Sequence, residues 1–193
     1  MKKSIVVILV LATVGAVVFL TSCGGKLKQL ANINFDIPYN QQITVPGTGY
    51  AYGTPLPGGG ITLPFPAVPV ATNSQQYITQ YHTSADKILM VNLKSMNLQI
   101  ASPSGQNFDF LDNISIYISA KNQPEMLIAS QNSVPKGQTT LNFTVPDSTV
   151  NLKSYFLADT MYFRLSAHIN AVPPTGEQLQ LSSVFHVLAN PLY

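Results

Sequence analysis

The chain has 193 residues, only 9% of them charged, and a formal net charge of +2. Lys2 and Lys3 account for the positive excess, so the rest of the chain has eight basic and eight acidic side chains. With Arg164 as its one arginine, the chain offers no basic surface for a phosphate backbone. This balance excludes nucleic acid as an expected partner.

The N-terminus has the layout of a secretory signal, with a basic start, an apolar stretch over residues 5–20 and small residues behind it. The stretch is shorter than the about 20 apolar residues of a membrane-spanning helix, which leaves an uncleaved anchor as the lesser alternative. Leu20-Thr21-Ser22-Cys23 resembles a bacterial lipobox. The resemblance implies cleavage after Ser22, a diacylglyceryl group on the Cys23 sulfur, and acylation of the new α-amine by a fatty acid such as palmitate.

Lipidation also accounts for the lone thiol, because Cys23 is the only cysteine and has no disulfide partner in the chain. Two or more acyl chains hold a protein stably at a membrane. We therefore expect a cleaved signal peptide over residues 1–22, a lipidated tether over 23–31 and a single domain over 32–193.

The first part of that domain has a Pro-, Gly- and Tyr-rich irregular section at residues 44–72. Alternation of apolar and polar residues predicts a strand around Ile33–Ile37, and a second short one at Gln42–Val45. Residues 61–70 contain three prolines, each of which lacks a backbone donor, and this predicts an edge segment. Residues 75–82 are expected to form a short helix capped by Asn73 or Ser74, or an irregular crossover.

Strand patterns dominate after residue 88. Residues 88–100 predict one long strand with a bulge, or two consecutive strands, and residues 108–120 predict another with a break at Asp112 and Asn113. Short strands are expected at 126–130 and 140–145. Residues 161–171 and 179–187 alternate most clearly, and the Pro-Pro-Thr-Gly turn between them predicts an antiparallel hairpin. The chain is thus expected to be an all-β antiparallel sandwich of about seven to nine strands, with an immunoglobulin-like arrangement as one candidate.

Candidates for catalysis are few. His168 and His186 occupy polar positions of predicted strands, and no third ligand accompanies them in the pattern, so a metal pair is not expected. Asp109 and Asp112 fit solvated surface positions better than a paired acid and base. We expect no enzyme activity, no metal and no cofactor.

Tyrosine supplies the binding hypothesis, because its ring combines a flat apolar face with a polar tip that suits sugars and protein partners alike. Such residues also commonly cover the edge of a sandwich, which is the competing interpretation. The residues expected to contact a glycan or peptide are Tyr50, Tyr52, Tyr77 and Tyr81.

Residues 107–120 (NFDFLDNISIYISA), together with Val150–Tyr155, resemble the uncharacterised β-sandwich lipoproteins of Bacteroidota. That resemblance implies compartment and fold, and no activity. Asp147-Ser148-Thr149 and Asp159-Thr160-Met161 are similar to an O-glycosylation signal of that phylum, which makes Ser148 and Thr160 candidate modification sites. By analogy with other lipoproteins, the lack of an aspartate directly after Cys23 favours the outer membrane, on either its periplasmic face or the cell surface.

The expected function is therefore that of a membrane-anchored cell-envelope lipoprotein. It would act as a non-enzymatic structural or protein-interaction module, with another envelope protein as a candidate partner. The alternative is a surface lipoprotein that binds a glycan or peptide through the Tyr- and Pro-rich segment.

Overall fold

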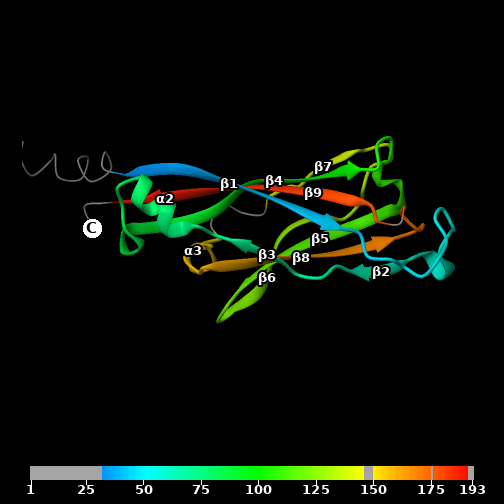
Figure 1. The fold of residues 1–193 in the computed structure, drawn as a ribbon, viewed down its shortest axis with the longest axis horizontal. Helices are drawn as coiled ribbons and strands as arrows, with labels where there is room; N and C mark the ends of the chain where they lie inside the picture. The colour runs from blue at the N-terminus through cyan, green and yellow to red at the C-terminus, as the bar shows by residue number, and fades with distance from the viewer. Residues whose placement is uncertain (1–31, 146–149, 175, 191–193) are drawn as a thin grey trace, which may run out of the picture.

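The computed structural model describes residues 32–145, 150–174 and 176–190. Within them, nine strands form two antiparallel sheets that pack face to face along an elongated molecule (Figure 1). The first sheet contains, in order, β1 (Ile33–Thr44), β9 (Gln178–Ala189), β4 (Ile88–Ser102) and β7 (Thr140–Asn142). The second contains β2 (Ile61–Pro64), β8 (Thr160–Ile169), β5 (Leu111–Ala120) and β6 (Gln123–Gln131), with β3 (Val68–Ala71) also paired to β8. The predicted all-β sandwich is confirmed.

The strand pairs are nested along the chain. β1 pairs with β9, β2 and β3 pair with β8, β4 pairs with β7, and β5 pairs with β6. The chain therefore resembles a long two-stranded ribbon that turns back at β5–β6, and the further pairs β4–β9 and β5–β8 roll this ribbon into two sheets. Nested pairing of this kind defines a jelly roll. An immunoglobulin sandwich has its first two strands in one sheet, whereas β1 and β2 lie in different sheets, so the immunoglobulin-like candidate is wrong.

The predicted C-terminal hairpin is also wrong. β8 and β9 lie in opposite sheets, and the connection between them crosses from one sheet to the other. Both strands do alternate as predicted, and their inward residues are buried. Alternation shows that a strand has one buried face, but it does not identify the neighbouring strand, because either sheet of a sandwich gives the same pattern.

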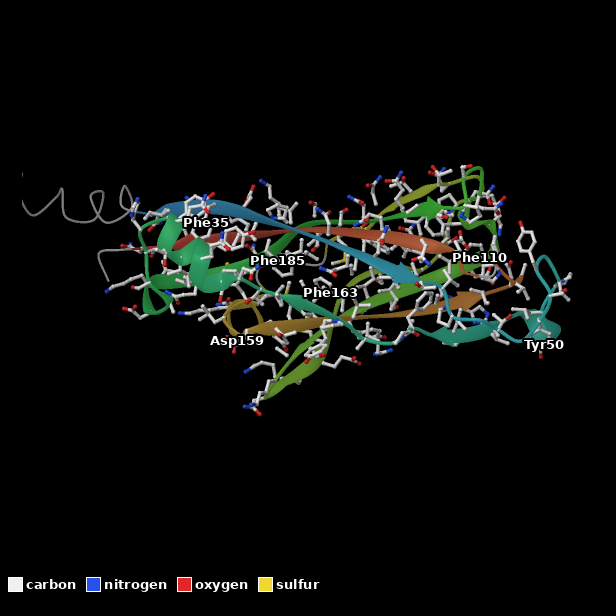
Figure 2. All side chains as sticks on the ribbon, viewed as in Figure 1. Phe35, Tyr50, Phe110, Asp159, Phe163 and Phe185 are labelled. Atoms are coloured by element: carbon white, nitrogen blue, oxygen red, sulfur yellow. The ribbon has the colours of Figure 1, made fainter. Side chains whose placement is uncertain are left out.

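The core lies between the two sheets. Phe163 of β8 and Phe185 of β9 face each other across it, with ring centroids 6.4 Å apart and both side chains at most 1% exposed (Figure 2). Full burial of such a side chain contributes about 1.5–3 kcal/mol. Leu141 of β7 and Phe143 are buried as well, although β7 ends at Asn142 and is shorter than the strand expected at 140–145.

The N-terminal strand is one continuous element rather than two. β1 pairs with β9 over twelve consecutive residues, Pro38 included. Pro38 fits because β1 is an edge strand, where a missing backbone donor interrupts no second ladder. β2 and β3 follow each other along β8, so the predicted edge segment at 61–70 is confirmed.

The turn before β2 depends on Gly60. Its φ of 120° is unfavourable for any side chain, and a Cβ there would lie 2.3 Å from the carbonyl oxygen of Ile169. The short 3₁₀ helix η1 (Pro57–Gly59) precedes it. This close approach fixes the turn against the end of β8.

The remaining short elements match the sequence in part. Helix α2 (Ser74–Gln80) confirms the predicted helix, but its N-cap residue Asn73 has φ 49° and makes no side-chain cap. β4 is one long strand with three register irregularities, as one of the two predicted options requires. Residues 108–110 form a 3₁₀ helix, η3 (Phe108–Phe110), rather than the start of β5. The other helical segments are η2 (Ala85–Lys87) and α3 (Lys153–Phe156).

The molecule has two distinct ends (Figure 1). The start of β1 lies at the end that carries α2 and α3, called the helix end below. The opposite end, called the loop end, consists of residues 45–60, 103–110 and 170–174, together with Glu177. Phe35 marks the helix end in Figure 2, and Tyr50 and Phe110 mark the loop end.

Candidate functional site at the loop end

Backbone hydrogen bonds hold the irregular segment of the loop end in place. The Gly53 N–H donates to the Val172 carbonyl over 3.1 Å, the Val172 N–H donates to the Thr54 carbonyl over 3.2 Å, and the Leu56 N–H donates to the Asn170 carbonyl over 3.1 Å. Residues rich in proline and glycine thus follow the connection between β8 and β9. The loop end is an ordered surface whose shape is set by backbone contacts.

Tyr50 and Tyr52 project from this surface. Their side chains are 51% and 60% exposed, which makes them the two most exposed large hydrophobic residues of the described chain. The Tyr52 hydroxyl donates to Gln106 Oε1 over 3.1 Å, which ties the 45–56 segment to the 103–110 connection. The Tyr52 ring can therefore be offered to a partner from a supported position.

Two depressions flank these tyrosines. One of about 230 Å³ lies beside Tyr50, and one of about 190 Å³ lies beside Tyr52. Both are smaller than the roughly 300–1,000 Å³ of a typical small-molecule pocket. Val172, Pro173 and Pro174 form a wall common to both. This geometry suits contact with a surface or a polymer better than enclosure of a small ligand.

Tyr77 and Tyr81 do not belong to this site, since they lie at the helix end, in α2 and directly after it (Figure 1). The Tyr81 ring stacks on Phe35 with centroids 4.0 Å apart and planes 10° apart. Tyr77 packs partly buried against the core. The four tyrosines singled out from the sequence therefore do not form one site, and only Tyr50 and Tyr52 are displayed.

Glu177 is the residue that the sequence analysis missed. Its side chain is fully buried, and neither carboxylate oxygen has a hydrogen-bond partner among the described residues. Burial without a partner disfavours the charged form and raises the pKa of Glu177 to about 7. Its carbonyl accepts a hydrogen bond from the Val45 N–H over 2.9 Å, so the residue sits where the 45–56 segment leaves the sheet.

A signal for Glu177 was present in the sequence. Glu177 has the same parity as Leu179 and Leu181, which places it on the inward side of β9 if the alternation is extended by one step. The same reasoning locates Ser183, which is buried and whose hydroxyl lacks a partner within the described residues.

The carboxylates considered for catalysis have local structural partners. Asp109 Oδ1 accepts the Gly137 N–H over 2.6 Å and so holds the connection between β6 and β7. Asp112 accepts a hydrogen bond from the Asn170 side chain. The interpretation of both as surface residues fits these contacts, although each also fixes a connection.

The histidines are separated by the core. His186 lies on the outer face of the first sheet, where its Nδ1 is 2.8 Å from Asp36 Oδ1, and His168 lies on the outer face of the second sheet. Lys94 Nζ bonds the other oxygen of Asp36 over 2.5 Å. The hydrogen bond from Lys94, and then that of His186, lowers the pKa of Asp36. No group of three or more His, Cys, Asp or Glu that could hold a metal occurs in the part of the chain that the structure describes.

The modification candidates are only partly visible. Cys23 and Ser148 lie outside the described residues. Thr160 is the first residue of β8, half-buried and paired with Ala71 of β3. Across residues 32–145, 150–174 and 176–190, no helix is both long and apolar enough to cross a bilayer.

Comparisons with known proteins identify no family for this chain. No family model and no curated protein matches the chain. Among solved structures, the decameric BFDV capsid protein shares 10% identity at a TM-score of 0.34, covering 81% of this chain and 99% of that one. A chain of infectious bursal disease virus Gt strain shares 13% identity at 0.31, over 79% of this chain and 33% of its own. A chain of Desmodium yellow mottle tymovirus shares 13% identity at 0.25, over 82% and 89%. Scores this low define no common family and transfer no function.

Proposed function

We propose that this chain is a lipid-anchored cell-envelope protein whose jelly-roll domain acts as a non-enzymatic interaction module. The Leu-Thr-Ser-Cys sequence ending at Cys23 supports the anchor. Nine residues separate Cys23 from the first residue of β1, so the link reaches at most about 35 Å. A tether of this length keeps the start of β1 close to a membrane.

The proposal rests on which end of the sandwich holds the start of β1 and which end displays the exposed tyrosines. β1 begins at the helix end, while the exposed Tyr50 and Tyr52 lie at the opposite end of the long axis (Figures 1 and 2). A chain anchored through its N-terminal segment therefore offers the loop end to partners away from the membrane. The outer membrane is the proposed location, on either its periplasmic face or the cell surface.

A non-enzymatic role is proposed because the candidate chemical groups already have structural contacts or are inaccessible. Asp109 and Asp112 fix connections, Asp36 is paired with Lys94 and His186, and Glu177 is sealed in the interior. The exposed carboxylates thus serve structural contacts, and the buried one is out of reach of a substrate.

Recognition of a glycan or peptide through the loop end is the second candidate function. The exposure of Tyr50 and Tyr52 favours it, because an exposed aromatic ring can stack on a sugar or pack on a partner at little conformational cost.

The anchor is tested by Cys23→Ser in the native host. The wild-type protein should fractionate with membranes and show the mass of a cleaved, acylated chain, whereas the variant should lose the lipid mass and leave the membrane fraction. Wild type and variant with the same mass and the same distribution would refute the anchor.

The interaction role is tested by pull-down of the detergent-extracted protein with a Tyr50→Ala/Tyr52→Ala variant. We expect loss of co-purifying partner or glycan. Tyr162→Ala is the matched control, because Tyr162 is also exposed, at 37%, but lies on the outer face of the second sheet. Equal recovery with all three proteins would rule out the loop end as the binding surface.

A further inference from the structure

The strand registers place uncharged polar side chains in regular rows on the outer face of the first sheet. Over the half of the first sheet next to the loop end, the outward side chains form three rows across the strands. The rows are Asn40–Ser182–Asn97–Asn142, Gln42–Gln180–Gln99–Thr140 and Thr44–Gln178–Ser102. We call these eleven residues the amide field.

The amide field carries no charged residue and no aromatic residue, since all eleven members are Asn, Gln, Ser or Thr. The other half of the same face contains Asp36, which pairs with both Lys94 and His186. A soluble surface usually mixes charges of both signs. In a chain with only 9% charged residues, the charged side chains of this face thus lie in its helix-end half, and a neutral polar area extends across four strands of the other half.

The two complete rows have unused hydrogen-bonding capacity. Within the described residues, no hydrogen bond uses the side chains of Asn40, Ser182, Asn97, Asn142, Gln42, Gln180, Gln99 or Thr140, whereas Gln178 in the third row accepts from Thr44 and donates to a backbone carbonyl. Each primary amide offers two donors and one acceptor. These groups point from a regular sheet at exposed or half-buried positions.

The spacing is that of the sheet itself. Strands lie about 4.8 Å apart and outward residues recur about every 6.7 Å along a strand, so the field covers roughly 14 Å by 14 Å. It is a grid of hydrogen-bond donors and acceptors. Such a grid fits an extended ligand that presents many hydroxyl groups, each of which can both donate and accept.

Other classes of partner fit less well. An anionic polymer or membrane surface requires Lys or Arg, and the field has neither. Protein interfaces are enriched in aromatic residues, Met and Arg at their centre, and the field has none of these. On the opposite sheet Arg164 does lie on the outer face, but it is held by Glu125 and by the Tyr117 ring, 4.4 Å from its guanidinium.

We infer that the amide field is a binding surface for a neutral, extended polysaccharide. This inference rests on glycan recognition, the second candidate function above, and names its ligand class. The field borders the loop end, because β1 leads from Thr44 into the segment that carries Tyr50, and β9 starts at Gln178. A chain lying on the field can therefore continue onto the exposed tyrosine rings. Individual hydrogen bonds to hydrated amides contribute little, so affinity comes from many contacts along one polymer.

The test uses the purified full-length protein in detergent. Insoluble neutral polysaccharides (cellulose, a β-1,3-glucan and mannan) and the anionic polygalacturonate serve as probes in a depletion assay. We expect binding to at least one neutral polysaccharide and none to polygalacturonate. Binding should persist in about 1 M NaCl, because no charged pair contributes.

A Gln42→Ala/Gln180→Ala/Gln99→Ala variant removes the central row. It should weaken binding about tenfold or more. Asn34→Ala is the matched control, because Asn34 is an exposed amide on the same face of β1 but lies outside the field, and it should bind as the wild type does. All changed positions point to solvent, and thermal unfolding checks that each variant is folded.

Three results would overturn the inference: no neutral polysaccharide bound, unchanged binding by the triple variant, or loss of binding in high salt. A dimer that the triple variant converts to a monomer would also overturn it, because a second copy would then be the occupant. Polysaccharide binding by the purified chain does not depend on the lipid. A failure to bind polysaccharide therefore does not contradict the lipid anchor tested by Cys23→Ser. Likewise, a failure of the anchor test does not contradict polysaccharide binding.

Discussion

The two ends of the sandwich use the same residue types in opposite ways. At the helix end Tyr81 stacks on Phe35. At the loop end Tyr50 and Tyr52 are more than half exposed, while a carboxylic acid, Glu177, is fully buried. Aromatic burial stabilises a fold and carboxyl burial costs free energy. The helix end thus buries an aromatic pair, which stabilises the fold, whereas the loop end exposes two tyrosines and buries a carboxyl, which costs stability.

Departures from the usual rules commonly occur where a surface is adapted to binding. The first sheet shows the same division along its length, with paired charges towards the helix end and the uncharged amide field towards the loop end. Both contrasts fit the proposal that the loop half binds a partner and that the helix half lies towards the anchor.

Glu177→Gln tests whether the carboxyl at the loop end is buried and protonated in the folded chain, and it has the largest expected effect. Between pH about 4.5 and about 7 the folded chain holds a proton on Glu177 that the unfolded chain has lost. The free energy of unfolding of the wild type should therefore fall as the pH rises through that window, by about 3 kcal/mol, and stay level above it. The variant should lack this decrease, as measured by urea unfolding at pH 4.5, 6 and 8.

Asp159→Asn is the matched control, an exposed side chain at the helix end (Figure 2). It should retain the pH dependence of the wild type. A difference between wild type and Glu177→Gln that is the same at all three pH values would contradict the burial of an unpaired carboxyl.

Tyr81→Ala and Tyr52→Ala compare the two ends directly. Loss of the Tyr81–Phe35 stack should lower the free energy of unfolding by about 2 kcal/mol, because packed ring area and the pair geometry are both removed. Tyr52→Ala should change it by less than about 0.5 kcal/mol. Chemical denaturation measures both, and equal losses would show that the loop-end tyrosine is also a packing residue.

Lys94→Met probes the charged half of the sheet. Without the Lys94 ammonium, the pKa of Asp36 should rise towards its ordinary value. A carboxyl with a lowered pKa stabilises the fold above its unfolded pKa and loses that contribution as the pH falls through its folded pKa. The variant should therefore be less stable at neutral pH, by under about 1 kcal/mol for so exposed a pair.

An NMR titration of the Asp36 carboxyl gives the pKa directly. Lys121→Met, at the turn between β5 and β6, changes an exposed lysine that does not contact Asp36 and should leave that pKa unchanged. An unchanged pKa in Lys94→Met would mean that the ion pair does not form in solution.

Local patterns predicted the elements well. Alternation located β8 and β9 and their inward residues, the three prolines identified an edge segment at 61–70, and the break at Asp112 and Asn113 coincides with a register shift in β5. These features depend on neighbours in the sequence. The 3₁₀ helix at Phe108–Phe110 was missed, because its aromatic spacing matches that of a strand.

The sequence by itself determined that this chain is a two-sheet β-protein with little charge and a lipobox-like start, because composition and period-two alternation are local properties. Only the tertiary structure decided the nested jelly-roll pairing. It also separated Tyr50 and Tyr52 from Tyr77 and Tyr81, and buried Glu177 with no hydrogen-bond partner for its carboxylate among the described residues. These features depend on which sheet each strand joins, and alternation is the same in either sheet.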